Sequence, residues 1–248
     1  MALSYDLIVV GAGHAGCEAA AAAARMGLSV AVVTFSAEQI ARLSCNPAVG
    51  GLAKGHLVRE LDALGGLMGR AADGSCIQFR RLNTRKGLAV QSSRAQVDID
   101  VYPRLMGELL LAIPGVNLVP GEVIDVRTAK GRVSGVTLMG GASLDAPRVC
   151  LATGTFLAGI LHCGERQKVG GRVGEGAAHH LSESLRGLGL RLRRLKTGTV
   201  PRLDASTIRW DKLAVQEDTS PEGRFSFGKR LSRLPTRDCY FAHTNENV

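Results

Sequence analysis

Three glycines near the N-terminus share one short loop, Gly11-Ala12-Gly13-His14-Ala15-Gly16. At this spacing Gly11 permits a tight turn, Gly13 lets a pyrophosphate approach the backbone, and Gly16 lets a helix pack closely on a strand. Backbone N–H groups at the start of that helix then face the phosphates. The loop therefore predicts a dinucleotide-binding site, and a glycine-rich turn with only a packing role is the alternative.

Cys45 is the thiol best placed for chemistry. It follows the second predicted strand in a loop rich in glycine and proline, on the side where doubly wound sheets bind ligands. A thiolate beside a cationic side chain such as Lys54 or Arg85 is a nucleophile. A buried structural cysteine is the alternative at this position.

The other cysteines are widely spaced and form no C-x-x-C pair, which argues against a zinc ribbon or a thioredoxin-type centre. We expect all of the thiols to be reduced and most of them to be small buried groups. These cysteines are Cys17, Cys76, Cys150, Cys163 and Cys239.

Basic side chains give the chain a net charge of +9, from 31 Lys and Arg against 22 Asp and Glu. This balance suits an anionic partner, although a solvated face is the alternative. Two clusters stand out, Arg80-Arg81 with Arg85-Lys86, and Arg191, Arg193, Arg194 with Lys196. A turn at Lys196-Thr197-Gly198-Thr199 could hold an anion through its N–H groups. Because aromatics are only 4%, phosphate contacts rather than base stacking should dominate any nucleic-acid binding.

The elements that must position the glycine loop follow a β-α-β order of about 30 residues. The sequence predicts a strand, an alanine-rich helix and a second strand over Tyr5–Val10, Cys17–Met26 and Ser29–Thr34. Gly27 is placed to end the helix. An acidic residue commonly ends the second strand and holds the ribose. Thr34 stands there, with Glu38 four residues later, so ribose recognition is not assigned.

Farther along, the pattern predicts helices over Lys54–Leu64, Asp98–Ala112 and Leu181–Leu188. Leu57, Val58, Leu61 and Leu64 would form the apolar face of the first. Strand-like runs at Val116–Val119, Val123–Val126 and Val133–Leu138 predict a small β-meander with a turn at Lys130-Gly131-Arg132. A buried strand, Arg148–Leu151, follows and leads into Ala152-Thr153-Gly154, and residues 164–176 are expected to be a loop.

Composition limits the class of protein. The chain has 248 residues, of which 45% are hydrophobic and 21% charged, which excludes a mainly disordered state. The apolar windows are short and interrupted, well under the roughly 20 residues of a membrane span. The first residues lead into a strand without a basic leader, so we expect a cytoplasmic protein.

Short strings in the same order along the chain carry a family resemblance. Besides the glycine loop they are Ser44-Cys45-Asn46-Pro47, Gly50-Gly51, Lys54-Gly55-His56-Leu57, Asp62-Ala63-Leu64-Gly65-Gly66, Arg94-Ala95-Gln96, Gly154-Thr155-Phe156-Leu157, Arg194-Leu195-Lys196-Thr197-Gly198-Thr199 and His243-Thr244-Asn245-Glu246. Together these strings resemble the MnmG (GidA) family of flavoproteins that modify the wobble uridine of tRNA. Members of that family are longer, and this chain resembles their N-terminal portion.

The resemblance implies a fold and a reaction. The expected fold is α/β, a Rossmann-like FAD-binding domain of the two-dinucleotide-domain flavoprotein type, with a small β-meander and the start of an inserted second domain. The implied reaction adds a carboxymethylaminomethyl or aminomethyl group to C5 of the wobble uridine. FAD is the implied cofactor, NADH and methylene-tetrahydrofolate are implied co-substrates, and an MnmE-type GTPase is the implied partner. A homodimer is implied for the full-length family.

The resemblance also assigns residues. The whole glycine loop and Val123 match flavin-contact positions, and Val123 would act through its main chain. Ala178 stands where the family usually has a contacting Ser, so it could reach FAD only through its backbone. Cys45 would be the nucleophile, adding to C6 of the pyrimidine so that C5 can attack a one-carbon donor.

The domain expectation is a FAD-binding domain over residues 1–203, followed by an incomplete nicotinamide-binding domain over 204–248. Three other functions stay open. One is a folate- and FAD-dependent tRNA uridine C5-methyltransferase, a second is an FAD oxidoreductase acting on a small molecule, and the third is a truncated, non-catalytic dinucleotide-binding protein. The strings Lys54–Leu57 and Arg194–Thr199 favour the wobble-uridine enzyme over the methyltransferase.

Overall fold

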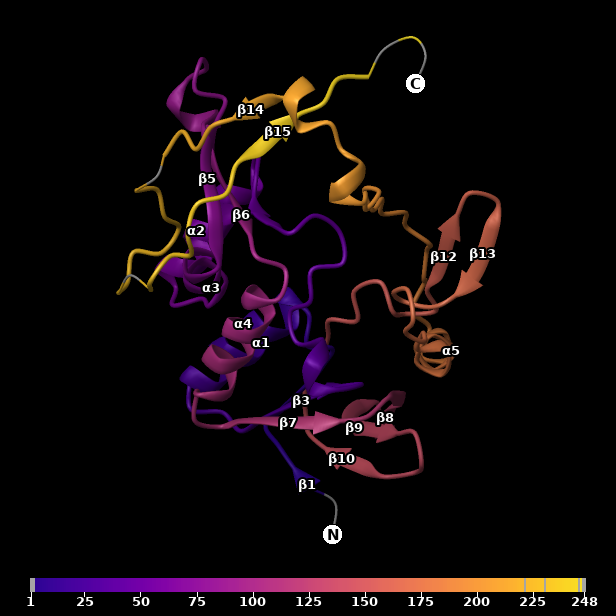
Figure 1. Cartoon of the computed structure of the whole chain (residues 1–248). Coiled ribbons are helices and arrows are strands. Elements are labelled where there is room, and N and C mark those ends of the chain that lie inside the picture. Colours follow the sequence, from indigo (N-terminus) through magenta and orange to yellow (C-terminus); the bar gives the residue numbers. More distant parts are fainter. Residues whose placement is uncertain (1–2, 221, 230, 245, 247–248) are drawn as a thin grey trace. The chain divides into compact units, whose positions relative to one another are not determined.

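The computed structural model describes residues 3–220, 222–229, 231–244 and 246, and its chain forms two compact units (Figure 1). Unit 1 contains Met1–Arg42 and Pro103–Lys196, and unit 2 contains Leu43–Tyr102 and Thr197–Val248. Helix α4, Val101–Leu111, begins in unit 2 and continues into unit 1. The domain boundary expected between residues 203 and 204 separates a FAD-binding from a nicotinamide-binding domain, which is a different division from these two compact units. That boundary stays a prediction.

Unit 1 is built on a parallel sheet of four strands in the order β11-β2-β3-β7. Helix α1, His14–Arg25, connects β2 to β3 and covers the sheet with its alanine face, which confirms the predicted β-α-β unit. The strands are β2 Leu7–Val10, β3 Val30–Thr34, β7 Val116–Pro120 and β11 Val149–Leu151. The predicted Rossmann-like α/β fold is therefore present.

Helix α1 packs tightly because its buried residues are small. Cys17, Ala20 and Ala21 are fully buried, and so are Ile8 and Val32 in the strands beneath. Alanine has the highest helix propensity and leaves room for close approach to the sheet. The helix ends where predicted, since Gly27 has φ +86°, a conformation that glycine adopts without steric cost.

A second sheet in unit 1 has the order β1-β10-β9-β8. Its strands are β1 Leu3–Ser4, β8 Val123–Ala129, β9 Arg132–Leu138 and β10 Ser143–Asp145. Lys130 and Gly131 both have positive φ in the turn between β8 and β9, which confirms the predicted hairpin. The sequence suggested that β7 belongs to this meander. In the structure β7 pairs with β3 instead. β-branched runs predict strands without specifying their sheet.

Helix α5, His179–Gly187, lies against the meander. The Ser184 hydroxyl donates to the Asp125 carboxylate at 2.6 Å and accepts from the backbone N–H of Val126 at 3.1 Å. The hairpin of β12 Ile160–Cys163 and β13 Arg166–Val169 is also present. The expectation of a loop over residues 164–176 is wrong for β13, whose exposed polar side chains give no apolar alternation to recognise.

Unit 2 contains a sheet of three antiparallel strands in the order β4-β6-β5, with two helices. Its elements are β4 Ala48–Gly50, α2 Lys54–Ala63, α3 Met68–Gly74, β5 Cys76–Leu82, β6 Ser92–Val97 and the two-stranded pair β14 Ala214–Gln216 and β15 Cys239–Phe241. Short 3-10 turns lie at Ala37–Gln39 in unit 1 and at Leu88–Val90, Ala205–Thr207 and Trp210–Lys212 in unit 2.

The predicted apolar face of α2 is wrong. Of its four residues only Val58 is buried, while Leu57 and Leu64 are 58% and 86% exposed. Gly55 is the other buried residue of the helix, and a methyl group there would meet the backbone of Ser93. The helix therefore approaches the sheet through bare backbone at Gly55 rather than through a leucine stripe.

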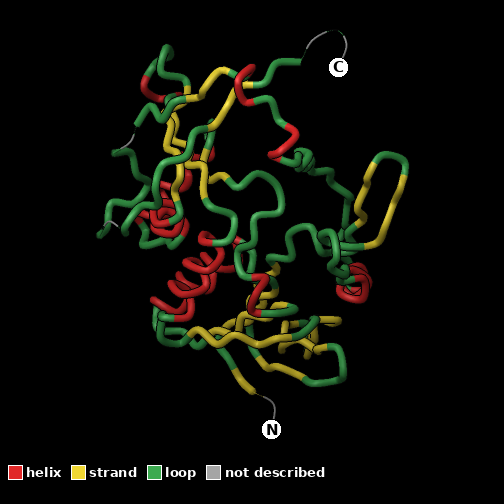
Figure 2. The backbone as a smooth tube through the Cα atoms, in the orientation of Figure 1, coloured by secondary structure: helices red, strands yellow, loops and turns green. Residues whose placement is uncertain are grey.

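Residues 223–228, named here the docked segment, hold the later part of unit 2 to its earlier part. Phe225 is fully buried with its ring centroid 5.3 Å from that of Phe79. The Asp73 carboxylate accepts hydrogen bonds from the backbone N–H of Phe225 at 2.7 Å and of Ser226 at 2.8 Å. Figure 2 shows that the surrounding chain is mostly loop, so these carboxylate contacts replace a regular element as the anchor.

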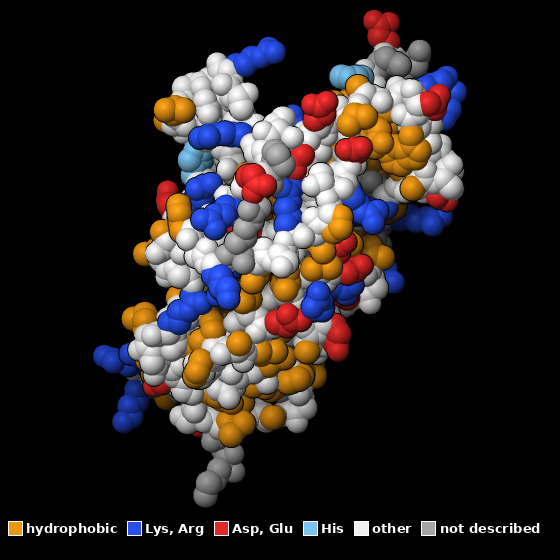
Figure 3. All heavy atoms as spheres, turned by 60° about the vertical axis from the view of Figure 1, so that its left-hand side comes forward, with side chains coloured by type: hydrophobic (Ala, Val, Ile, Leu, Met, Phe, Trp, Pro, Cys, Tyr) orange, Lys and Arg blue, Asp and Glu red, His pale blue; other side chains and the backbone are white. Residues whose placement is uncertain are grey.

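The surface carries its charge in scattered groups. On the face drawn in Figure 3, Lys and Arg side chains lie in several separate places with Asp and Glu among them. Among the described helices, none combines the length and the apolar character that a membrane span requires.

Candidate functional site

The glycine loop joins the end of β2 to the start of α1 in unit 1. Gly11 has φ +104°, and a Cβ there would collide with the Ala152 carbonyl. A Cβ on Gly16 would collide with the carbonyl of Gly11. Gly13 is different, because a Cβ built on it meets no atom within 4 Å. Two of the glycines are thus required by packing, and the third leaves open space in front of the helix.

Hydrogen bonds from three directions fix the loop. The N–H of Gly11 donates to the Val33 carbonyl at 2.8 Å. The carbonyl of Ala12 accepts from the N–H of Ala41 at 2.8 Å and from the Cys17 thiol at 3.3 Å. Burial raises the pKa of Cys17 to about 12, so its thiol stays a protonated donor. The loop is therefore held in one backbone conformation before any ligand binds.

The start of α1 is suited to an anion. The first helical bond runs from the N–H of Cys17 to the carbonyl of Gly13, so the N–H groups of Ala15 and Gly16 have no preceding carbonyl in the helix. Gly13 caps the helix without a side chain, and the first turn contains no acidic residue. Burial lowers the pKa of His14, which favours its neutral form. The loop fits a pyrophosphate for three reasons: the open space at Gly13, the positive end of the α1 dipole, and the backbone held by hydrogen bonds.

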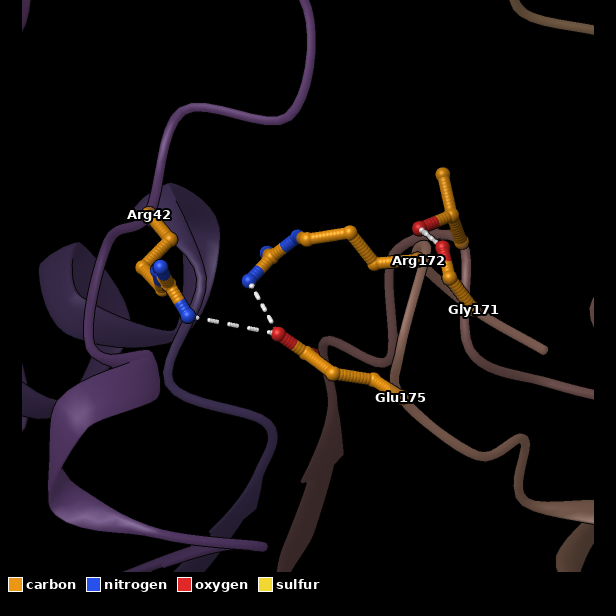
Figure 4. Close-up of polar contacts among 5 residues, drawn as sticks. Arg42, Gly171, Arg172 and Glu175 are labelled. Carbon is orange, nitrogen blue, oxygen red and sulfur yellow. Dashed lines mark hydrogen bonds and ion pairs between the residues drawn. The ribbon is translucent and has the colours of Figure 1, made fainter. Parts of the chain in front are cut away.

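Aromatic and charged side chains gather where the neighbouring strands end. Phe35 follows β3 and Phe156 follows β11, with ring centroids 5.7 Å apart. The Arg172 guanidinium lies 5.5 Å from the centroid of the Phe156 ring. It also donates to Glu175 at 3.1 Å, as Figure 4 shows. Arg42 reaches the same carboxylate oxygen at 3.4 Å. Sequence reasoning missed this group; its only signal was Phe35 directly after β3 and Phe156 in the loop that follows β11.

The ribose position stays unassigned. Thr34 is buried at the end of β3, and its carbonyl accepts from the N–H of Gly121 at 2.8 Å. Glu38 is exposed on the following 3-10 turn, where a hydrogen bond from Ser36 lowers its pKa. Neither contact shows what would hold a ribose.

Val123 and Ala178 lie in one hydrophobic core cluster together with Ile8 and Val10 of β2. Both side chains are buried there, so a cofactor could meet them only through the main chain. The N–H of Ala178 already donates to the Phe156 carbonyl at 2.8 Å, and its carbonyl accepts from Ala158 at 3.0 Å. The flavin contacts expected at these two positions stay predictions, and the N–H of Ala178 is already used in its bond to Phe156.

Cys45 lies half-buried in unit 2. Its Sγ is 3.9 Å from the Thr197 hydroxyl, and its carbonyl accepts a hydrogen bond from Arg202 at 2.7 Å. Lys54 or Arg85 beside this thiol stays a prediction, while the Arg202 guanidinium bonds the backbone carbonyl of Cys45 rather than Sγ. Cys45 is distant in sequence from both Thr197 and Arg202, so no local sequence pattern could have predicted these contacts.

The second basic cluster lies on irregular chain. Residues 190–204 contain no helix, strand or turn, so the turn expected at Lys196–Thr199 is not formed. Arg194 donates to the Ala158 carbonyl at 3.0 Å, while Arg191 and Arg193 are exposed. The cysteine expectation also needs correction, because only Cys17 and Cys76 are buried.

Comparison with known proteins gives one consistent family. The family model described as glucose inhibited division protein A matches residues 6–248. The tRNA uridine 5-carboxymethylaminomethyl modification enzyme MnmG of Granulibacter bethesdensis is 48% identical over 248 residues, covering 99% of this chain and 39% of its own length. The protein of the same name from Myxococcus xanthus is 50% identical over 252 residues, covering 98% and 41%. This chain thus spans about two fifths of the length of these relatives.

Solved structures agree with the sequence comparison. The structure of Aquifex aeolicus GidA in its form II crystal matches with a TM-score of 0.90 and 42% identity, over 96% of this chain and 40% of that one. The GidA-related protein from Thermus thermophilus matches with a TM-score of 0.56 and 23% identity, over 75% and 69%, and supports the fold alone.

Proposed function

The chain belongs to the glucose inhibited division protein A family, and we propose that it is the FAD-binding portion of a tRNA wobble-uridine modification enzyme. The proposed reaction adds a carboxymethylaminomethyl or aminomethyl group to C5 of the uridine. The observation that carries the proposal is the glycine loop, whose fixed backbone and open space at Gly13 fit a pyrophosphate. The chain spans about two fifths of its relatives, so the complete reaction is proposed for a protein of their length.

The glycine loop of residues 11–16 would hold the FAD pyrophosphate with backbone N–H groups and the positive end of α1. Bound FAD supplies electron transfer, and NADH and methylene-tetrahydrofolate are the proposed sources of electrons and of the one-carbon unit. Arg42 and Arg172 both form ion pairs with Glu175.

Cys45 is the proposed nucleophile. Its thiolate would form a bond to C6 of the uridine, and the C5–C6 π electrons would move toward the C4 carbonyl oxygen. C5 then attacks the methylene carbon of the one-carbon donor, whose C–N electron pair moves onto the folate nitrogen, and loss of the C5 proton expels the thiolate. The Thr197 hydroxyl is near enough to Sγ to orient it, and Arg202 holds the Cys45 backbone.

The partners follow from the same reaction. tRNA would be the substrate, contacted at its phosphates by the exposed side chains of Arg81, Arg85 and Lys86 and by the basic cluster at residues 191–196. An MnmE-type GTPase, a homodimer and a cytoplasmic location belong to the proposal for the complete enzyme.

Filling the open space at Gly13 tests the cofactor assignment. Gly13→Val places a side chain where the pyrophosphate would lie, and its Cβ meets no atom of the described chain within 4 Å. Its φ of −70° is suitable for valine. We expect FAD affinity to fall at least about tenfold, or about 1.4 kcal/mol, with the thermal midpoint little changed.

The matched control is Gly187→Val, at the end of α5. A Cβ on Gly187 also meets nothing within 4 Å, and the residue lies outside the glycine loop. It should bind FAD like the unaltered chain. Equal FAD binding by Gly13→Val and the control would overturn the assignment of this loop to the pyrophosphate.

A further inference from the structure

Two arginines lie opposite one another on the three-stranded sheet of unit 2. Arg80 of β5 is the register partner of Arg94 of β6, so both side chains project from the same face. Phe79, one residue earlier, projects from the other face and packs against Phe225. Like charges directly opposite in a sheet destabilise it unless something of opposite charge lies between them.

The strands β14 and β15 lie near β5 (Figure 1), and they contact the side chains of Gln78 and Arg80. The Gln78 amide donates to the Gln216 carbonyl of β14 at 2.6 Å, and the Arg80 guanidinium lies 5.7 Å from the Phe241 ring of β15. The arginines are therefore part of a covered polar layer rather than of an open surface, and both are half-buried.

Among the residues that the structure describes, neither guanidinium has an ion-pair partner. Nε and Nη1 of Arg80 are buried and have no hydrogen-bond partner within the described ranges, and no hydrogen bond joins Arg94 to a side chain described there. Burial raises the pKa of Cys239, which lies close to both arginines, so its thiol is protonated at neutral pH and is not the missing anion. The nearby Asp238 is exposed to solvent.

We propose that Arg80 and Arg94 form a binding site for a dianionic phosphate, such as the terminal phosphate of a small phosphorylated ligand. Two guanidinium groups supply two positive charges and planar N–H forks that match phosphate oxygens. An oxyanion between them supplies the acceptors that the buried nitrogens of Arg80 need, and it removes the repulsion across the strands. The two charges match a dianion better than the single charge of a backbone phosphodiester.

This site is separate from the glycine loop and does not depend on FAD or on the proposed tRNA reaction. The pyrophosphate site is in unit 1, whereas Arg80 and Arg94 are in unit 2. A failure of either assignment would leave the other in place.

Calorimetric titration of the 248-residue chain with inorganic phosphate, at constant ionic strength, tests the proposal. We expect saturable binding that Arg80→Gln and Arg94→Gln each weaken at least about tenfold. Arg132→Gln is the control, because Arg132 is an exposed arginine on β9 in unit 1, outside the proposed site. It should change the phosphate affinity less than about twofold. Circular dichroism establishes that each variant is folded. If Arg80→Gln does not fold, the phosphate affinity of Arg94→Gln, on the other strand, tests the site by itself.

Dimethyl phosphate, a monoanionic diester, distinguishes the two sources of phosphate. Inorganic phosphate should bind more tightly than dimethyl phosphate. Equal affinities would favour a nucleic-acid backbone and overturn the assignment to a dianion. The absence of saturable phosphate binding, or an equal loss of binding in Arg132→Gln, would overturn the site itself.

Discussion

At the scale of single residues, Asp73 shows how one carboxylate can replace an element. It accepts two backbone N–H groups of the docked segment, at Phe225 and Ser226, where no helix or strand is available to bond them. Asp62 does the same for Phe227 at 2.7 Å. These contacts join parts of the chain that are far apart in the sequence, 152 residues in the case of Asp73 and Phe225.

Asp73→Asn should therefore destabilise the protein. Asparagine keeps the size of the side chain but replaces one acceptor oxygen with a donor, which leaves one buried N–H unpaired. We expect the free energy of unfolding to fall by about 1–3 kcal/mol, measured by urea denaturation. Asp100→Asn, at an exposed aspartate, is the control and should have almost no effect. A loss of the same size in both variants would contradict the role given to Asp73.

The pH dependence of this difference has a definite sign. Burial raises the pKa of Asp73 in the folded state, so the folded protein holds this proton more tightly than the unfolded chain does. Its contribution to stability is largest below its ordinary pKa and declines as the pH rises through the folded value. The stability difference between the unaltered chain and Asp73→Asn should shrink from about pH 4 toward neutrality in urea titrations. A difference that grows with pH would show that the pKa is lowered instead.

Residue-level prediction from the sequence succeeded where the cause is local. The separate requirements on Gly11 and Gly16 follow from a tight turn and close packing, and both are present. The partners of Cys45 were not predictable, because Thr197 is 152 residues away in the sequence. The functions of the loop and of Cys45 stay predictions.

At the scale of elements, the sequence predicted the presence of most helices and strands better than their packing. The β-α-β unit, α4, α5 and the hairpin turn at Lys130 are confirmed. The buried face of α2 was wrong because an apolar stripe does not reveal a close approach through a glycine. β13 was missed because its side chains are exposed, and strand pairing there comes from the backbone alone.

Gly55→Ala tests the packing of α2. Alanine in a helix interior is ordinarily more favourable than glycine by about 1 kcal/mol. At Gly55, however, the added methyl group would lie 2.5 Å from the Ser93 carbonyl oxygen and would push the helix away from β6. We expect a net loss of about 1–3 kcal/mol in the free energy of unfolding. Gly187→Ala, with open space around its Cβ, should not lose stability. A stabilised Gly55→Ala would contradict the close approach.

At the scale of the whole molecule, two compact units are interleaved in the sequence, since each is built from two separate stretches of chain. The class of fold and the family were predictable, because the motifs are spread along the chain and the family model covers residues 6–248. The division into units was not, because it depends on the docked segment and on contacts between distant stretches.

The net charge of +9 leads to a prediction about tRNA binding. If the second basic cluster contacts phosphates, Arg193→Gln should weaken binding and reduce the slope of log K against log salt by about 0.9. Fluorescence anisotropy with labelled tRNA at several salt concentrations measures this slope. Arg132→Gln, which removes an exposed arginine from β9, is the control. An unchanged slope in Arg193→Gln would remove this residue from the proposed tRNA contact.

The central claim is that this fold holds FAD, and the visible absorption spectrum of the purified chain tests it most directly. The chain is first incubated with excess FAD and desalted, and the bound nucleotide is then released by heat and identified. We predict a flavin absorption band at a stoichiometry near one, with FAD as the released nucleotide. A folded chain that retains no flavin after this treatment would contradict the claim.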